Sequence, residues 1–131
     1  MTTTITTLDL FNLAEAIECT VTYHHGGAKG VYHHPSRTIS LRNSLTDRQL
    51  RCTLAHELGH AIRGDAPVSG VFCDHIERRA DEFAARLLIS PIEYQLAEAL
   101  HGGHIGGIAY ELEVTPHLVE VWRGMYRKIA L

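Results

Sequence analysis

The sequence predicts a mostly helical α+β domain with a small antiparallel sheet near its start. Its 131 residues are the size of one domain and enough to bury a core. Short segments of alternating β-branched residues occur only in the first third, and apolar residues at helical spacing dominate afterwards. Helices that follow strands, rather than alternate with them, are typical of α+β proteins. Because no repeat or low-complexity linker divides the chain, we expect one domain over residues 1–131.

The first third is expected to form one helix and then the sheet. Apolar residues at helical spacing indicate the helix, and the β-branched alternation from Thr20 to Tyr23 indicates the first strand. A His-His-Gly-Gly sequence then turns the chain. The expected elements are a helix over residues 8–17 and strands over residues 19–23, 30–33 and 38–41. Together the three strands would make a small antiparallel meander.

The remaining chain is expected to form five helices with recognisable ends. Thr46 and Gln49 form a capping-box pattern, and the helix that they open would end near residue 63, before Gly64. Asp74 can cap the next helix, and Ser90 followed by proline typically starts another. The later helices are expected from residue 74 to about 89, from 91 onward, near 108–112 and from 116 to about 128, after a loop over residues 66–73. Four glycines between residues 102 and 107 would loosen the chain.

Composition and charge exclude several classes of protein. Hydrophobic residues make up 45% of the chain, charged residues 21%, and the formal net charge is -3, which gives no electrostatic reason to expect a nucleic-acid or membrane partner. Cys19, Cys52 and Cys73 are odd in number and form no CxxC pair, which favours a reducing compartment. The start of the chain lacks signal-peptide features, and no apolar run approaches the roughly 18 residues that span a bilayer. We therefore expect a cytoplasmic protein.

The sequence His56-Glu57-Leu58-Gly59-His60 predicts a zinc site. Histidines four residues apart on a helix lie on one face, so both imidazoles can reach one ion. Glu57 lies beside that ion and can act as the general base towards the attacking water. Gly59 could leave room for a substrate backbone beside the histidines. An apolar stripe away from the histidines would anchor the helix, through Leu50, Leu54, Leu58 and Ala61. The competing interpretation is a chance arrangement of ordinary helix residues.

The following helix offers a third metal ligand. Glu77 and Asp81 lie four residues apart at the edge of its apolar face, where two carboxylates need a compensating charge. We expect Glu77 to bind zinc and Asp81 to accept a hydrogen bond from the far nitrogen of a ligand histidine, most simply His56. The alternatives are a solvated helix rim, direct binding by Asp81, or a ligand at residues 73–75, which are Cys, Asp and His.

The segment from Thr46 to Pro91 resembles the ImmA/IrrE-type HExxH zinc metallopeptidase family. HELGH followed by Glu-x-x-Ala-Asp-x-Phe-Ala-x-x-Leu-Leu-Ile and a proline carries the resemblance. It implies a zincin-like metallopeptidase domain with Zn²⁺ on His56, His60 and Glu77 and with Glu57 as base. Members typically act in bacteria, often in mobile elements or prophages, and cleave helix-turn-helix repressors. The resemblance therefore implies a protein substrate, and such a repressor is the expected partner.

The sequence has features of two other functions. The same zinc site could hold together a regulatory protein-interaction domain with little or no peptidase activity, although Glu57 argues for catalysis because a structural site has no use for a base. Residues 108–122 have the cadence of a helix-turn-helix, but their second helix would begin with His117, Leu118, Val119 and Glu120. A DNA-reading helix needs basic and amide side chains there, so nucleic-acid binding is disfavoured.

Several residues keep open roles at the sequence level. A peptidase needs a donor for the oxyanion of the tetrahedral intermediate, and Tyr94, His101, His104 and Tyr110 are all candidates. Cys52 is expected to be a small buried filler, and Cys73 could bind zinc in a latent form. Four histidines flank the predicted hairpin and are expected to be exposed turn residues rather than a second metal site: His24, His25, His33 and His34.

Overall fold

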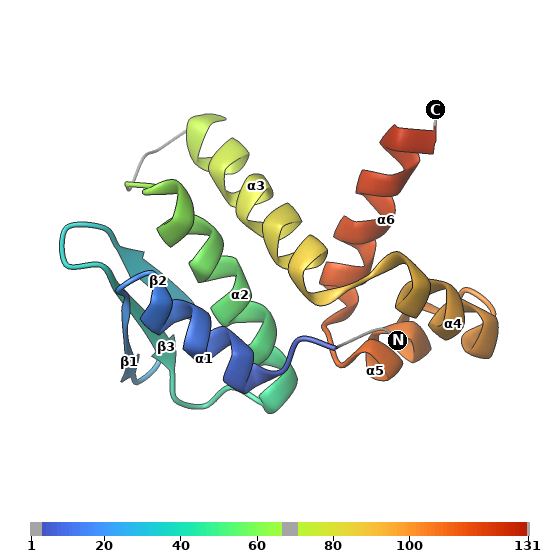
Figure 1. Cartoon of the computed structure of the whole chain (residues 1–131), viewed down its shortest axis with the longest axis horizontal. Coiled ribbons are helices and arrows are strands. Elements are labelled where there is room, and N and C mark those ends of the chain that lie inside the picture. Colours follow the sequence, from blue (N-terminus) through green and yellow to red (C-terminus); the bar gives the residue numbers. More distant parts are fainter. Residues whose placement is uncertain (1–3, 67–70, 131) are drawn as a thin grey trace.

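The computed structural model describes residues 4–66 and 71–130 and has the expected mostly helical α+β architecture (Figure 1). The elements in chain order are α1 (Thr7–Ala16), β1 (Thr20–His24), β2 (Gly30–His33), β3 (Thr38–Arg42), α2 (Asp47–Arg63), α3 (Val71–Leu88), α4 (Pro91–His101), α5 (Ile105–Leu112) and α6 (Pro116–Ala130). The sheet packs against α1 and α2, and α3 lies between α2 and α6. The zinc-site helix of the sequence prediction, α2, is therefore covered on both sides.

The sheet is mixed, so the expected antiparallel meander is wrong in one pairing. Its strand order is β1-β3-β2: β3 pairs antiparallel with β2, as expected, but parallel with β1. Ile39 and Leu41 of β3 are fully buried, in keeping with the central place of this strand. As a result β2 is an edge strand, and among the described residues no strand pairs with its outer side.

Local end signals place α2 and α4 where they were predicted. The Thr46 hydroxyl accepts a hydrogen bond from the Gln49 amide (3.2 Å), and the Gln49 side chain accepts one from the Thr46 amide (3.1 Å). Gly64 ends α2 in the left-handed conformation, with φ 68°. Ser90 caps α4, and proline occupies its first turn. These caps satisfy backbone groups that a helix leaves unpaired at its ends.

The starts of α3 and α5 lie earlier than predicted. Because α3 begins at Val71, Asp74 lies in its first turn instead of capping it, and residues 71–73 are helical rather than loop. Residues 67–70 of the expected loop lie outside the described residues. His104 caps α5 by accepting the Gly107 amide at 3.0 Å, so Gly106 and Gly107 lie inside this helix and do not loosen it.

The close packing of α2 against α3 brings the predicted site together. Leu54, Leu58 and Ala61 of α2 are buried, which confirms most of the expected apolar stripe. Gly59 faces α3: a Cβ atom here would lie 3.1 Å from Phe83 Cδ1 and 3.3 Å from the Ala80 Cα. Gly59 therefore makes room for the neighbouring helix, not for a substrate backbone as the sequence suggested.

Candidate metal centre

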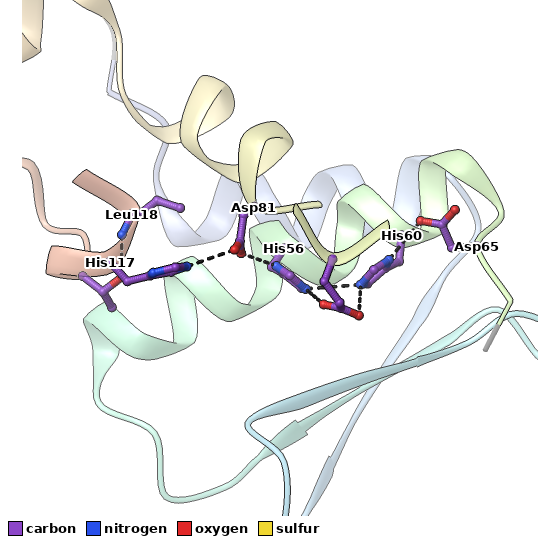
Figure 2. Close-up of polar contacts among 8 residues, drawn as sticks. His56, His60, Asp65, Asp81, His117 and Leu118 are labelled. Carbon is purple, nitrogen blue, oxygen red and sulfur yellow. Dashed lines mark hydrogen bonds and ion pairs between the residues drawn. The ribbon is translucent and has the colours of Figure 1, made fainter. Parts of the chain in front are cut away.

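The two histidines of the HExxH sequence point to one place beside α2. His56 and His60 lie on the same side of the helix, and their Nε2 atoms are 3.2 Å apart (Figure 2). The ligand atoms of His56, Glu57 and His60 all lie within 4.8 Å of one another. One helical turn therefore presents two imidazole nitrogens and a carboxylate to the same small volume.

Glu77 of α3 reaches both histidines. Its Oε2 lies 2.7 Å from His56 Nε2, and its Oε1 lies 3.1 Å from His60 Nε2. Glu57 makes no such bond to either ring, so Glu77 is the carboxylate that completes the group, although its side chain is 52% exposed. The structure thus brings the three predicted ligands together, while their binding of zinc stays a prediction.

A carboxylate fixes the far nitrogen of each histidine. Asp81 Oδ1 accepts a hydrogen bond from His56 Nδ1 at 2.7 Å, the contact that the sequence predicted. Asp65 Oδ2 lies 2.9 Å from His60 Nδ1, a contact that the sequence interpretation missed. The signal for it is the left-handed Gly64, which turns the chain back so that the Asp65 amide donates to the His60 carbonyl at 3.0 Å. Such carboxylates set the orientation and tautomer of ligand histidines.

The charges around His56 fit a cation between the rings. Burial disfavours a charged imidazole here, but the Asp81 hydrogen bond and the nearby Glu57, Asp81 and Glu77 charges outweigh it and raise the His56 pKa to about 9. Both ring nitrogens face carboxylate oxygens at 2.7 Å, so both carry protons in the ion-free protein. Carboxylates and imidazoles are ligands that zinc prefers. A divalent cation can therefore replace the proton that now links His56 to Glu77.

Glu57 is buried next to this group and has an unused oxygen. The residue is 5% exposed, and its Oε2 atom has no hydrogen-bond partner among the described residues. Burial raises the Glu57 pKa, while the neighbouring His56 and His60 charges oppose this effect. Gly30 of β2 packs against this part of α2, since a Cβ atom there would be 2.6 Å from Thr53 Cγ2 and 3.0 Å from Glu57 Cγ. A buried carboxylate with a free oxygen and a raised pKa is suited to accepting a proton.

The group lies on a cavity of about 620 Å³. Its walls come from β2, α2, α3 and the start of α6, including Val31 on the exposed side of the edge strand. Cys52 and Cys73 also line it; the first is buried, as expected. The lining joins residues 29–32, at the edge strand, to both histidines, and the volume exceeds that of a single side chain.

The four candidate oxyanion donors lie away from this cavity. Tyr94 donates to Glu98 and accepts from Arg123, His101 faces Glu111, and His104 caps α5. Neither they nor Tyr110 line the cavity, whereas His117, which the sequence placed in a possible DNA-reading helix, does.

The hairpin histidines only partly match the expected exposed turn residues: His25 and His33 are exposed, His24 and His34 are half-buried, and His24 and His33 end strands. His24 contacts Ser40 (2.6 Å) and the Ala28 carbonyl (2.8 Å), and His25 contacts Asn43 at 2.9 Å. The remaining two behave alike, with His33 bonded to Ser36 and His34 to Tyr32. Among the described residues, the group that could hold a metal includes none of these four.

An HExxH helix, a glutamate from the next helix and a buried free carboxylate define the class of metallopeptidase-like domains. Residues 14–121 match the family described as IrrE N-terminal-like domain, Peptidase_M78. Because the match covers most of the chain, the protein belongs to this peptidase family, which confirms the resemblance to ImmA/IrrE proteins. No curated protein matches the chain at a significant level. Within the described part of the chain, no helix combines the length and apolarity needed to cross a membrane.

Proposed function

We propose that this protein is a zinc-dependent endopeptidase. The observation that carries the proposal is the meeting of His56 Nε2, His60 Nε2 and the Glu77 carboxylate beside the unbonded Oε2 of Glu57. Three protein ligands leave one position open, which distinguishes catalytic zinc sites from structural ones. When bound, zinc supplies Lewis-acid chemistry that polarises a peptide carbonyl and makes water more acidic.

Each residue then has a defined task in peptide hydrolysis. His56, His60 and Glu77 hold the ion, while Asp81 and Asp65 keep the two imidazoles oriented. Glu57 accepts a proton from the water molecule that adds to the carbonyl carbon. It delivers this proton to the peptide nitrogen as the carbon–nitrogen bond breaks, so that an acid and an amine are formed.

The free side of β2 suits an extended peptide. A substrate segment can add to an edge strand through backbone hydrogen bonds, and β2 borders the cavity next to Glu57. Backbone pairing would hold the substrate while its side chains occupy the cavity. This arrangement favours a flexible segment of a protein over a compact folded region.

We further propose that the substrate is a helix-turn-helix repressor of a bacterial or prophage regulatory system and that the reaction takes place in the cytoplasm. Support for the substrate comes from the family alone, since its members act on such regulators. Three free cysteines suit a reducing compartment.

The direct test mixes the zinc-loaded protein with the repressor-like regulator encoded nearest to its gene and follows the mass of the regulator. Glu57→Gln is the matched control, because it keeps the size of the side chain and removes the base. We expect cleavage by the wild type alone. Equal cleavage by both proteins would reject Glu57 as the base, and no cleavage by either would reject this substrate.

A regulatory zinc domain without peptidase activity is the second candidate. The observation that favours it is the position of the Glu57 carboxylate within 4.8 Å of both histidine nitrogens, where it could be a fourth ligand of a closed site. The two functions differ in one measurable property. Glu57→Gln should leave zinc affinity nearly unchanged if Glu57 is a base, and should weaken it strongly if Glu57 is a ligand.

A further inference from the structure

Asp81 holds two histidines, and only one of them belongs to the HExxH sequence. Its Oδ1 accepts from His56 Nδ1 at 2.7 Å, and its Oδ2 accepts from His117 Nε2 at 2.9 Å. The contacts form a row from His117 through Asp81, His56 and His60 to Asp65 (Figure 2). His117 comes from α6, which follows α3 by almost thirty residues, so the row joins three separate helices.

The turn before α6 is attached to α2 one turn ahead of His56. Arg51 is buried and donates to the Leu112 carbonyl (2.9 Å) and the Glu113 carbonyl (2.8 Å) at the end of α5. The Thr115 amide contacts Cys52 Sγ at 3.4 Å. Because α2 carries both anchoring residues, the start of α6 has a fixed place relative to the metal centre.

We propose that His117 is a positioning residue of the metal centre, which acts by holding the second oxygen of Asp81. This inference rests on the proposed metal function. A carboxylate with one hydrogen bond can rotate about its Cβ–Cγ bond, whereas two donors on opposite oxygens fix its plane. A fixed Asp81 holds the His56 ring with its Nε2 towards His60 and Glu77, the orientation that a shared ion needs.

His117 is placed to act through Asp81 and not on the ion itself. Its Nε2 is used by Asp81, which lies between His117 and His56. This contact gives residues at the start of the helix-turn-helix-like segment a role inside the domain. The first turn of α6 faces the cavity with His117 and the core with buried Leu118, so these side chains are committed to the peptidase domain.

The test measures the zinc dissociation constant of the full chain by competition with a coloured chelator. His117→Leu removes the donor, and His117→Gln keeps an N–H group at similar reach. Loss of an outer hydrogen-bond partner typically weakens metal binding about 10-fold to 100-fold, so we expect about 10-fold for His117→Leu and recovery of most of it in His117→Gln. His25→Leu, an exposed hairpin histidine, is the control and should bind zinc like the wild type.

A double-mutant cycle separates positioning from general folding. His117→Leu should weaken zinc binding in the wild type but add little in an Asp81→Ala background, because the partner is already gone. The ion-free thermal midpoint of His117→Leu should stay near that of the wild type, since the side chain is 66% exposed.

Zinc affinity that is unchanged in His117→Leu overturns the inference, and so does an equal further loss in the Asp81→Ala background. If the wild type itself binds no zinc, the proposed function and this inference fail together. Tight binding by the wild type and by both His117 variants rejects only the role of His117.

Discussion

Zinc binding should release a proton from His56, and the structure sets the size of this effect. The ion-free ring is held between Asp81 and Glu77 with both nitrogens protonated, and its pKa is raised from 6.5 to about 9. A metal ligand must be deprotonated, so zinc competes with this proton below pH 9. Well below pH 9 each pH unit changes that competition about tenfold, and half of the His56 rings are still protonated at pH 9, so binding at pH 7 should be about 50-fold weaker than at pH 9.

Calorimetry at pH 7.5 in buffers with different ionisation enthalpies measures the proton directly. We expect about one proton released per zinc ion. Chelator competition between pH 6.5 and 8.5 should give a dissociation constant that falls as pH rises. Glu57→Gln should release as many protons per zinc ion as the wild type, which would exclude Glu57 as their source. Asp81→Asn should release fewer, because it removes the carboxylate that holds the proton on His56.

The same proton links pH to the stability of the ion-free protein. Because the folded pKa of His56 lies above its ordinary value, the stabilisation is fully present below pH 6.5 and is lost as pH rises through 9. The ion-free thermal midpoint should therefore fall over this range, unlike that of the zinc-loaded protein. Zinc binding that releases no proton at pH 7.5 and does not vary with pH would refute the charge arrangement inferred for His56.

Three substitutions test other parts of the site. Gly30→Ala should lower turnover by about 100-fold with little change in zinc content, because a Cβ atom 2.6 Å from Thr53 Cγ2 and 3.0 Å from Glu57 Cγ forces both side chains to move and displaces the base. Gly124→Ala, which meets nothing within 4 Å, is its control. Glu77→Ala should weaken zinc binding more than any outer substitution, and zinc content equal to that of the wild type would place the third ligand elsewhere. Asp65→Ala should weaken zinc binding about tenfold in chelator competition, and an unchanged dissociation constant would show that Asp65 does not support the site.

Features that depend on near neighbours in the chain could be predicted from the sequence. Thr46, Gly64 and Ser90 mark helix ends because each satisfies backbone groups within a few residues. The order of the strands depends on which distant segment each one meets, and β-branched alternation does not encode it. The central position of β3, with Ile39 and Leu41 buried, therefore appears only in three dimensions.

In the site, too, contacts set by spacing within one helix could be predicted, and contacts between distant helices could not. The spacing of Glu77 and Asp81 on one helix predicted that both carboxylates lie near the histidines, and the predicted contact between Asp81 and His56 is present. The contact between His117 and Asp81 needs the packing of α6 beside α3, which no local pattern reports. Function thus depends on a short local motif whose orientation is set by helices from elsewhere in the chain.

Gly59 offers the sharpest test of how packing controls this motif. Its backbone packs against α3, and a Cβ atom would lie 3.1 Å from Phe83 Cδ1 and 3.3 Å from the Ala80 backbone. Since the Ala80 backbone cannot rotate away as a side chain can, Gly59→Ala should push α3 outward and cost about 1–3 kcal/mol of stability. The same shift moves Glu77 and Asp81 away from the histidines, so zinc affinity should fall together with the thermal midpoint. A Gly59→Ala protein with lower stability but unchanged zinc affinity would show that the spacing of α2 and α3 does not set the metal centre.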